Sequence, residues 1–248
     1  MEHRADADAL ALVRRFVARC HPDAEAALLA GSRSRGRGAP GSDYDVILLF
    51  GELPNGAWRE TSAFEEQVIE TFAHDRGTLG YFCREVDRPS GLPVLPTMIA
   101  EGIPVLSRSP ALLEDARRIA AETLRSGPPP LSPETLRNRR YAITDMAATL
   151  SGNRGEDIMI ATGAALHLAL ADFALRAAGR WSARGKAIPA ALAAMDPALA
   201  ARFTAAFAAL FTTRDAAPAL ALVDAILAPY GGSLRAGYRK AASAAWRI

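Results

Sequence analysis

The sequence has few cysteines, few lysines and little net charge, and each shortage narrows the classes of protein that it can encode. Cys20 and Cys83 are the only cysteines and lack metal-type spacing, which argues against a disulfide framework and a thiolate metal centre. The formal net charge is only +2, too small by itself to predict a nucleic-acid surface. Lys186 and Lys240 are the only lysines, so 27 of the 29 basic residues are arginines, a bias typical of GC-rich bacterial genomes.

Long apolar runs are also missing. No segment reaches the ~20 uninterrupted apolar residues that a membrane span requires, and the N-terminal stretch lacks the apolar core of a signal peptide. We therefore expect a cytoplasmic protein with reduced thiols and no membrane partner. Both cysteines are expected at core or boundary positions.

The composition changes at residues 126–133, where four prolines in eight residues remove backbone donors and hold the chain extended. This segment predicts a linker between a domain over residues 1–125 and a domain over residues 134–248. The first half alternates helical and extended patterns, whereas the second half is almost purely helical. We therefore predict an α+β fold, with a mixed β-sheet flanked by helices in the first domain and an α-helical bundle in the second.

The second half predicts helices over residues 133–150, 156–178, 186–193, 197–211 and 217–227. A helix beginning at Pro133 would be capped by Ser132 or a neighbour. Within the second helix, apolar residues recur at helical spacing and predict one continuous stripe facing the bundle core, made of Ile160, Ala164, Leu168, Ala171 and Leu175.

The strongest chemical pattern joins Gly31 and Ser32 to Asp43 and Asp45 across a ten-residue spacer. The two aspartates stand two apart at the head of an apolar run, and in a strand such residues face the same side. Adjacent carboxylates repel one another unless a cation lies between them, and hard oxygen ligands favour magnesium bound together with substrate phosphates. Gly31 lets the backbone approach a phosphate closely, and Ser32 supplies a hydroxyl. The pattern predicts a site for a metal-bound nucleoside triphosphate.

This segment resembles the signature of the nucleotidyltransferase superfamily, which includes DNA polymerase beta, the aminoglycoside nucleotidyltransferases and the minimal nucleotidyltransferases. That signature is an hG[GS] turn, a spacer and a Dh[DE]h strand, matched here by residues 30–32 and 43–46. Residues 34–36 and Ser42 also match bacterial members. The resemblance implies a nucleotidyltransferase domain followed by an acceptor-binding helical domain, and it assigns nucleotide binding to Gly31, Ser32, Arg35 and Ser42.

The superfamily also uses a third carboxylate on a neighbouring strand. Glu70 is our candidate, because Val68, Glu70 and Phe72 share one face by period two and the segment is similar to the second strand of relatives. Glu85 and Asp87 stay open as alternatives, since residues 81–86 can be interpreted as a strand, although their apolar residues also recur at helical spacing.

The resemblance implies two magnesium ions, about 3.5 to 4 Å apart, with Asp43, Asp45 and Glu70 as metal ligands and catalytic residues. One ion would carry the triphosphate and the other the attacking hydroxyl. Glu70 would ligate the second ion, accept the hydroxyl proton, or do both.

Three residues of the second half have two open interpretations each. The turn around Lys186 resembles one in bacterial nucleotidyltransferases, which implies that Lys186 contacts the triphosphate, but an exposed lysine in a helix connection fits equally well. Asp145 fits a solvated helix face or a contact with the nucleotide or acceptor. Glu156 fits ordinary stabilisation of a helix N-terminus. The resemblance to aminoglycoside nucleotidyltransferases implies, as the other interpretation, that Glu156 is a base that the helical domain lends to the acceptor.

We expect a magnesium-dependent nucleotidyltransferase that transfers a nucleoside monophosphate, AMP from ATP, to a hydroxyl of a small-molecule acceptor and releases pyrophosphate. An aminoglycoside-like acceptor is compatible with this organisation. The alternatives are a protein-modifying, AMPylating enzyme of the antitoxin type and an ATP-binding module without turnover. A nucleic-acid substrate is not expected, because no basic tract is present. The acceptor, the nucleobase and the oligomeric state, a homodimer included, stay open.

Overall fold

The computed structural model describes residues 7–36, 38–39, 41–152 and 155–242. The chain divides into two compact units, residues 1–127 and 128–248, each with its own hydrophobic core. Arg37 and Pro40, within the spacer between Ser32 and Asp43, lie outside the described residues.

Unit 1 contains a five-stranded sheet with the strand order β3-β4-β2-β1-β5. β2 and β4 are parallel, and the other neighbouring strands are antiparallel, so the sheet is mixed as predicted. The strands are β1 (Ala26–Leu29), β2 (Tyr44–Leu49), β3 (Trp58–Phe64), β4 (Gln67–His74) and β5 (Ile103–Ser107).

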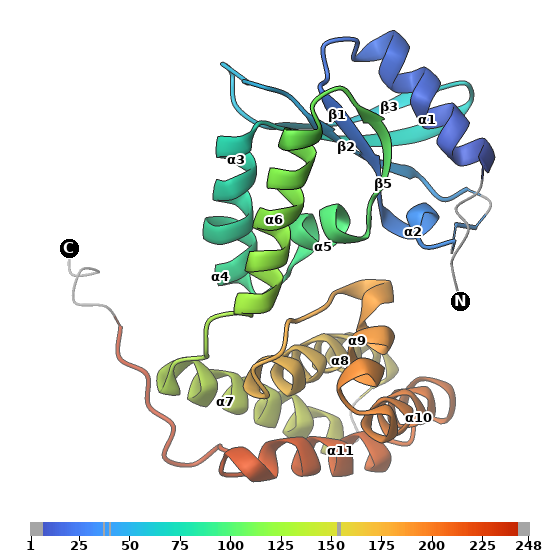
Figure 1. Cartoon of the computed structure of the whole chain (residues 1–248). Helices are drawn as coiled ribbons and strands as arrows, with labels where there is room; N and C mark the ends of the chain where they lie inside the picture. Colours follow the sequence, from blue (N-terminus) through green and yellow to red (C-terminus); the bar gives the residue numbers. More distant parts are fainter. Residues whose placement is uncertain (1–6, 37, 40, 153–154, 243–248) are drawn as a thin grey trace. The chain divides into compact units, whose positions relative to one another are not determined.

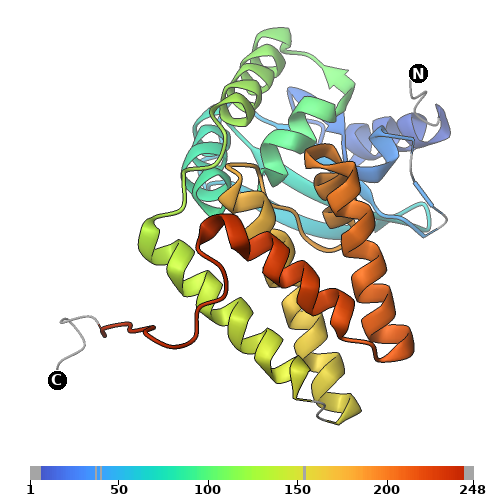
Figure 2. The ribbon, with the colours of Figure 1, turned by 90° about the horizontal axis from the view of Figure 1, so that it is seen from below.

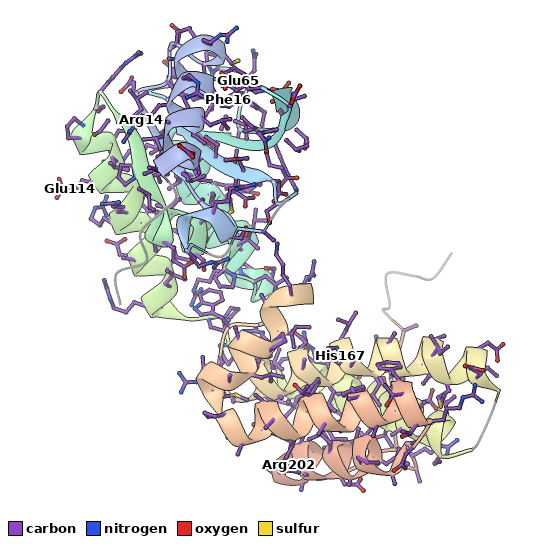
Figure 3. The ribbon with its side chains drawn as sticks, turned by 90° about the vertical axis from the view of Figure 1, so that its right-hand side faces the viewer. Arg14, Phe16, Glu65, Glu114, His167 and Arg202 are labelled. Carbon is purple, nitrogen blue, oxygen red and sulfur yellow. The ribbon has the colours of Figure 1, made fainter. Side chains whose placement is uncertain are left out.

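Helices cover both faces of this sheet (Figure 1). On one face lies α1, whose Phe16 ring packs edge-on against Phe64 with 5.4 Å between ring centroids (Figure 3 labels Phe16). On the other face, α3, α5 and α6 pack against β1 and β2. The helical elements of unit 1 are α1 (Ala7–Cys20), α2 (Gly31–Ser34), α3 (Arg76–Tyr81), the π-helix η1 (Phe82–Asp87), α4 (Arg88–Ser90), α5 (Val94–Glu101) and α6 (Pro110–Ser126).

The alternation of side chains along β2 and β4 decides which residues enter which layer. Leu48 lies in the core beneath α1, whereas Ile47 and Phe72 pack with the core beneath α3, α5 and α6. Asp45 and Glu70 precede Ile47 and Phe72 by two residues, so their side chains project from this second face. The acidic side chains of both strands therefore belong to the face that carries most of the helices.

Unit 2 is helical throughout its described elements. Its long helices α7, α8, α10 and α11 lie side by side around one core (Figure 2). Ser132 Oγ accepts the Thr135 N–H at 3.0 Å and so begins α7 directly after the proline-rich segment. The α+β architecture is confirmed. The elements are α7 (Pro133–Ser151), α8 (Glu156–Ala177), the 3-10 turn η2 (Gly185–Ala187), α9 (Ile188–Met195), α10 (Pro197–Thr213), α11 (Ala217–Leu227) and the 3-10 turn η3 (Ala228–Tyr230).

The predicted core stripe of α8 is wrong over its first half. The core-facing residues there include Gly163 and Leu166, because α10 approaches closely at Gly163: a Cβ at this position would lie 2.9 Å from Leu210 Cδ2. Of the residues in the predicted stripe, Ala171 and Leu175 are buried, whereas Ile160, Ala164 and Leu168 are exposed.

By length and composition alone, α8 is apolar enough to cross a membrane.

The two cysteines differ in environment. Cys83 is buried, and burial raises the pKa of its thiol to about 12, so it is protonated at neutral pH. Cys20, the last residue of α1, is exposed. The expected core or boundary position is therefore wrong for Cys20, since the buried face of α1 ends at Val17.

Candidate active site

Three carboxylates converge where the start of β2 lies beside the middle of β4. Oxygens of Asp43, Asp45 and Glu70 all lie within 4.8 Å of one another, and each residue is half-buried. Asp45 and Glu70 are paired residues of the parallel ladder, which places their side chains next to each other on one face. Asp43 lies two residues before Asp45 and reaches the same point. This arrangement offers a cation several hard oxygen ligands.

Gly31 lies directly against Asp45. The Ala30 N–H donates to the Asp45 carbonyl at 2.8 Å, which fixes the chain after β1 beside the start of β2. Gly31 has φ +68°, and a Cβ at this position would lie 1.7 Å from Asp45 Oδ2. No side chain fits there without moving the carboxylate, so glycine is required both by its backbone conformation and by the space.

Two buried polar atoms next to Gly31 have no hydrogen-bond partner among the described residues. They are Ser32 Oγ and Arg35 Nε. Arg35 is held at its other end, where Nη1 forms an ion pair with Glu101 of α5 at 2.8 Å. An unsatisfied buried polar group costs about 1–3 kcal/mol, and a phosphate oxygen would satisfy either atom. The turn after β1 thus has unused donors beside the three carboxylates.

Arg33 ties α2 to the segment that leads into β2. Its Nη2 donates to the Ser42 carbonyl at 2.6 Å, and its Nε lies 3.3 Å from the Asp43 carbonyl. Its guanidinium also stacks over the Tyr44 ring, 3.9 Å from the centroid. Ser42 Oγ accepts the Ala39 N–H at 3.0 Å and so closes the preceding turn. Arg33 positions Asp43, whereas a role of Ser42 in nucleotide binding stays a prediction.

Glu70 forms an ion pair with a neighbouring arginine. Arg59 of β3 places Nη2 2.7 and 2.9 Å from the two Glu70 oxygens, and its guanidinium carbon lies 4.9 Å from the centroid of the Phe72 ring. The Arg59 side chain is 61% exposed and that of Glu70 is 20% exposed. An exposed ion pair of this kind is worth about 0–1 kcal/mol, which a divalent cation can outcompete.

The alternative third carboxylates lie elsewhere. Residues 82–87 form the π-helix η1, so the interpretation of this segment as a strand is wrong. Glu85 is exposed on that helix, and Asp87 Oδ2 accepts the Leu95 N–H at 2.7 Å. Burial raises the pKa of Asp87, against the hydrogen bonds from the first amides of α5. Only Glu70 of these three residues joins the two aspartates.

The residues of unit 2 with open roles have local explanations. Lys186 lies exposed on the turn η2, and Asp145 lies exposed on α7. Glu156 forms an ion pair with Arg214 at 2.5 Å, across the beginning of α8 and the end of α10. That these three residues act on the nucleotide or on the acceptor remains a prediction.

Sequence reasoning missed Arg33 and Arg59. Arg33 is one of several arginines in the spacer, and no spacing rule distinguishes the one that folds back onto its own segment. Arg59 lies on β3, a strand that the sequence analysis did not predict. Residues 58–64 have two charged and two hydroxyl residues in succession and no alternation of apolar and polar residues, so no period-two signal marks this strand.

The comparisons with known proteins show no family for this chain. No family model and no curated protein matches the sequence. Among solved structures, the chain is similar to a nucleotidyltransferase-like protein from Exiguobacterium sibiricum 255-15, with 10% sequence identity and a TM-score of 0.42. The alignment covers 89% of this chain and 74% of that chain. A likeness of this size carries no functional argument, so the function has to be argued from the carboxylates and the turn beside them.

Proposed function

We propose that this chain is a magnesium-dependent nucleotidyltransferase that transfers AMP from ATP to a hydroxyl of a small molecule. The observation that carries the proposal is the convergence of Asp43, Asp45 and Glu70 oxygens within 4.8 Å. In the reaction the acceptor oxygen bonds to the α-phosphorus, the bond to the β-phosphate oxygen breaks, and pyrophosphate leaves. The acceptor proton passes to Glu70 or to solvent.

The donor set fits magnesium. Three carboxylates supply only hard oxygen ligands, and half-burial leaves room for substrate oxygens and water to complete the coordination. When bound, magnesium would neutralise charge on the phosphates and lower the pKa of the attacking hydroxyl. Asp43, Asp45 and Glu70 would hold it, and Gly31 keeps the Asp45 carboxylate in place.

The turn after β1 supports the assignment of the triphosphate. Ser32 Oγ and Arg35 Nε are buried donors with no partner in the described part of the chain. They adjoin Gly31, whose missing side chain lets a ligand approach the backbone. An anionic group bound here would reach both donors and lie next to a metal held by the aspartates.

One observation favours a second candidate, an ATP-binding module without turnover. Both Glu70 oxygens accept hydrogen bonds from Arg59. If this ion pair persisted with ATP bound, Glu70 would be a weaker metal ligand and a weaker base, because the guanidinium competes for both of its oxygens. ATP and magnesium would then bind without release of pyrophosphate.

The test combines ATP binding with turnover. We would measure magnesium-dependent ATP binding by calorimetry and pyrophosphate release with a mixture of hydroxylated acceptors, for wild type, the double variant Asp43→Asn with Asp45→Asn, and Glu70→Gln. The matched control is Glu114→Gln, which changes an exposed acid on α6 (Figure 3).

The two candidates give different results. For the transferase, the double variant loses metal-dependent ATP binding, and Glu70→Gln keeps binding but loses at least about a hundredfold in turnover, the upper range for disturbed metal sites. For the binding module, wild type binds ATP and releases no pyrophosphate with any acceptor. Absence of metal-dependent ATP binding in wild type refutes both candidates.

A further inference from the structure

A pocket of about 340 Å³ lies in unit 1, on the sheet face that carries the three carboxylates. β3 and β4 contribute Arg59, Phe72 and His74, and the helical segments after β4 contribute Phe82, Asp87 and Met98. Its volume is at the low end of the ~300–1,000 Å³ typical of small-molecule sites. None of the steps proposed so far uses this pocket.

The pocket begins beside Glu70. Phe72 follows Glu70 by two residues on the same face of β4, a separation of about 7 Å along a strand. Arg59 joins the two places, because it bonds Glu70 and also lines the pocket. A ligand at the Arg59 end of the pocket therefore lies close to Glu70.

The strand order places the pocket opposite the turn that would hold the triphosphate. Gly31 follows β1, on one side of β2, whereas β4 and β3 lie on the other side. Along the sheet, the sequence of features is the Gly31 turn, the carboxylates and then the pocket. A ligand here would approach the carboxylates from the side away from the Gly31 turn, the side on which we place the attacking hydroxyl.

The pocket wall is apolar and partly open to solvent. Phe82, Val86 and Val94 are 38%, 39% and 54% exposed, although each lines the pocket. Large apolar side chains exposed together around a hollow are typical of binding sites. The wall therefore favours a ligand that offers apolar surface.

The charges around the pocket disfavour a polycation. Asp87 is the only acid among the described lining residues, and Leu95 N–H already donates to its Oδ2. Arg59 adds a positive charge at the end nearest Glu70. An aminoglycoside needs several free carboxylates, and the pocket supplies none.

His74 provides one specific polar contact. It is only 4% exposed, and its Nδ1 has no hydrogen-bond partner within the described residues. Burial lowers the pKa of His74 to about 4, so the imidazole is neutral at pH 7. A neutral imidazole can form one hydrogen bond with a hydroxyl or carbonyl group without burying a charge.

We propose that this pocket binds the acceptor of the transfer reaction, and that the acceptor is a small aromatic alcohol without positive charge. Its ring packs between Phe72 and Phe82, and its hydroxyl points toward Glu70. That the ligand is the acceptor rests on the proposed function. That the ligand is an uncharged or anionic aromatic compound rests on the pocket alone.

The test uses probes of opposite chemistry. We would measure binding to the full chain, without ATP, by ligand-observed NMR for 2-phenylethanol, for 4-hydroxyphenylacetate and for the polycation kanamycin. Two pocket variants, Phe82→Ala and Val94→Thr, change exposed residues, and Val94→Thr preserves shape in case the first variant folds poorly. Tyr81→Ala is the matched control, because Tyr81 is an adjacent aromatic residue, 60% exposed, that does not line this pocket.

We expect both aromatic alcohols to bind wild type and the control equally. Phe82→Ala should weaken binding at least about fourfold, the equivalent of one buried methylene group, and Val94→Thr by about twofold or more. Equal binding of the alcohols to wild type and both pocket variants overturns the proposal, as does the absence of binding to wild type. Kanamycin binding that the pocket variants weaken also overturns it.

ATP separates this inference from the proposed function. Affinity for magnesium and ATP should be unchanged in Phe82→Ala, and a loss there assigns the pocket to the nucleotide and overturns the proposal. Variant-sensitive binding of the alcohols in a protein that binds no ATP supports the ligand chemistry and contradicts the transferase. Pyrophosphate release that only non-aromatic acceptors stimulate supports the transferase and contradicts the pocket.

Discussion

Replacement of Gly31 by alanine should lower the affinity for magnesium in a protein that still folds. Gly31 has φ +68°, and an L-residue in this left-handed conformation costs about 1–2 kcal/mol. That strain alone predicts a fall of about 4–8 °C in the melting temperature of a unit of this size. The new methyl group also has to share space with Asp45, since Cβ would lie 1.7 Å from Oδ2 and 2.6 Å from Cγ.

The collision can be relieved only by moving the Asp45 carboxylate. Asp45 has a short side chain, so rotation about its χ angles displaces both oxygens from the cluster with Asp43 and Glu70. We expect the affinity for magnesium in the presence of ATP to fall at least about tenfold, the lower range for disturbed metal sites. The assay is calorimetric titration of magnesium into protein with a non-hydrolysable ATP analogue.

The matched control is Gly56→Ala. Gly56 has a similar φ of +80°, and a Cβ there meets no heavy atom of the described residues within 4 Å. Both variants should therefore lose the stability that the left-handed conformation costs an L-residue, while only Gly31→Ala also loses magnesium affinity. Equal magnesium affinity in the two variants would refute the inference that Asp45 is a metal ligand held in place by Gly31.

Three further predictions concern single side chains. Arg59→Met should lower the magnesium concentration that half-saturates the protein by up to about fivefold, because Glu70 loses a competing partner worth about 0–1 kcal/mol; an unchanged titration would contradict this competition. The pKa of His74 is about 4 in the folded protein, below its ordinary 6.5, so the unfolded state binds more protons and stability falls as the pH falls between these values. Urea unfolding at pH 7 and pH 4 should show about 3 kcal/mol of this loss in wild type but not in His74→Gln. Asp196→Ala removes the side chain that accepts the first amides of α10, so unfolding of unit 2 should require about 1 kcal/mol less while magnesium affinity is unchanged.

Local chemistry made much of the fold predictable. The helices of unit 2 begin and end near the predicted residues, because prolines and capping side chains mark their boundaries. Ser132 and Asp196 accept amide hydrogens at the starts of α7 and α10. The motif spacing likewise predicted two aspartates on one face of a strand, and their roles await measurement.

Other features depend on contacts that no local pattern encodes. β3 and β4 are joined by a two-residue turn at Glu65 and Glu66, with φ of +48° and +63°. Such turns usually contain asparagine or glycine, so the hairpin lacks its usual signal. Arg15 of α1 forms an ion pair with Glu65 at 2.6 Å, a partner fifty residues away along the chain. Because β3 was not predicted, neither was the position of Arg59.

That hairpin also matters for chemistry, because one strand serves two sites. Glu70, Phe72 and His74 alternate along β4 and face the same side, with Glu70 at the carboxylate cluster and the other two in the pocket wall. A slip of one residue against β2 would turn all three to the opposite face and present Thr71 and Ala73 instead. The register of β4 therefore sets the position of the proposed metal ligand and that of the proposed acceptor pocket together. A variant that weakens the Glu65–Glu66 turn without touching either site should reduce both functions in parallel.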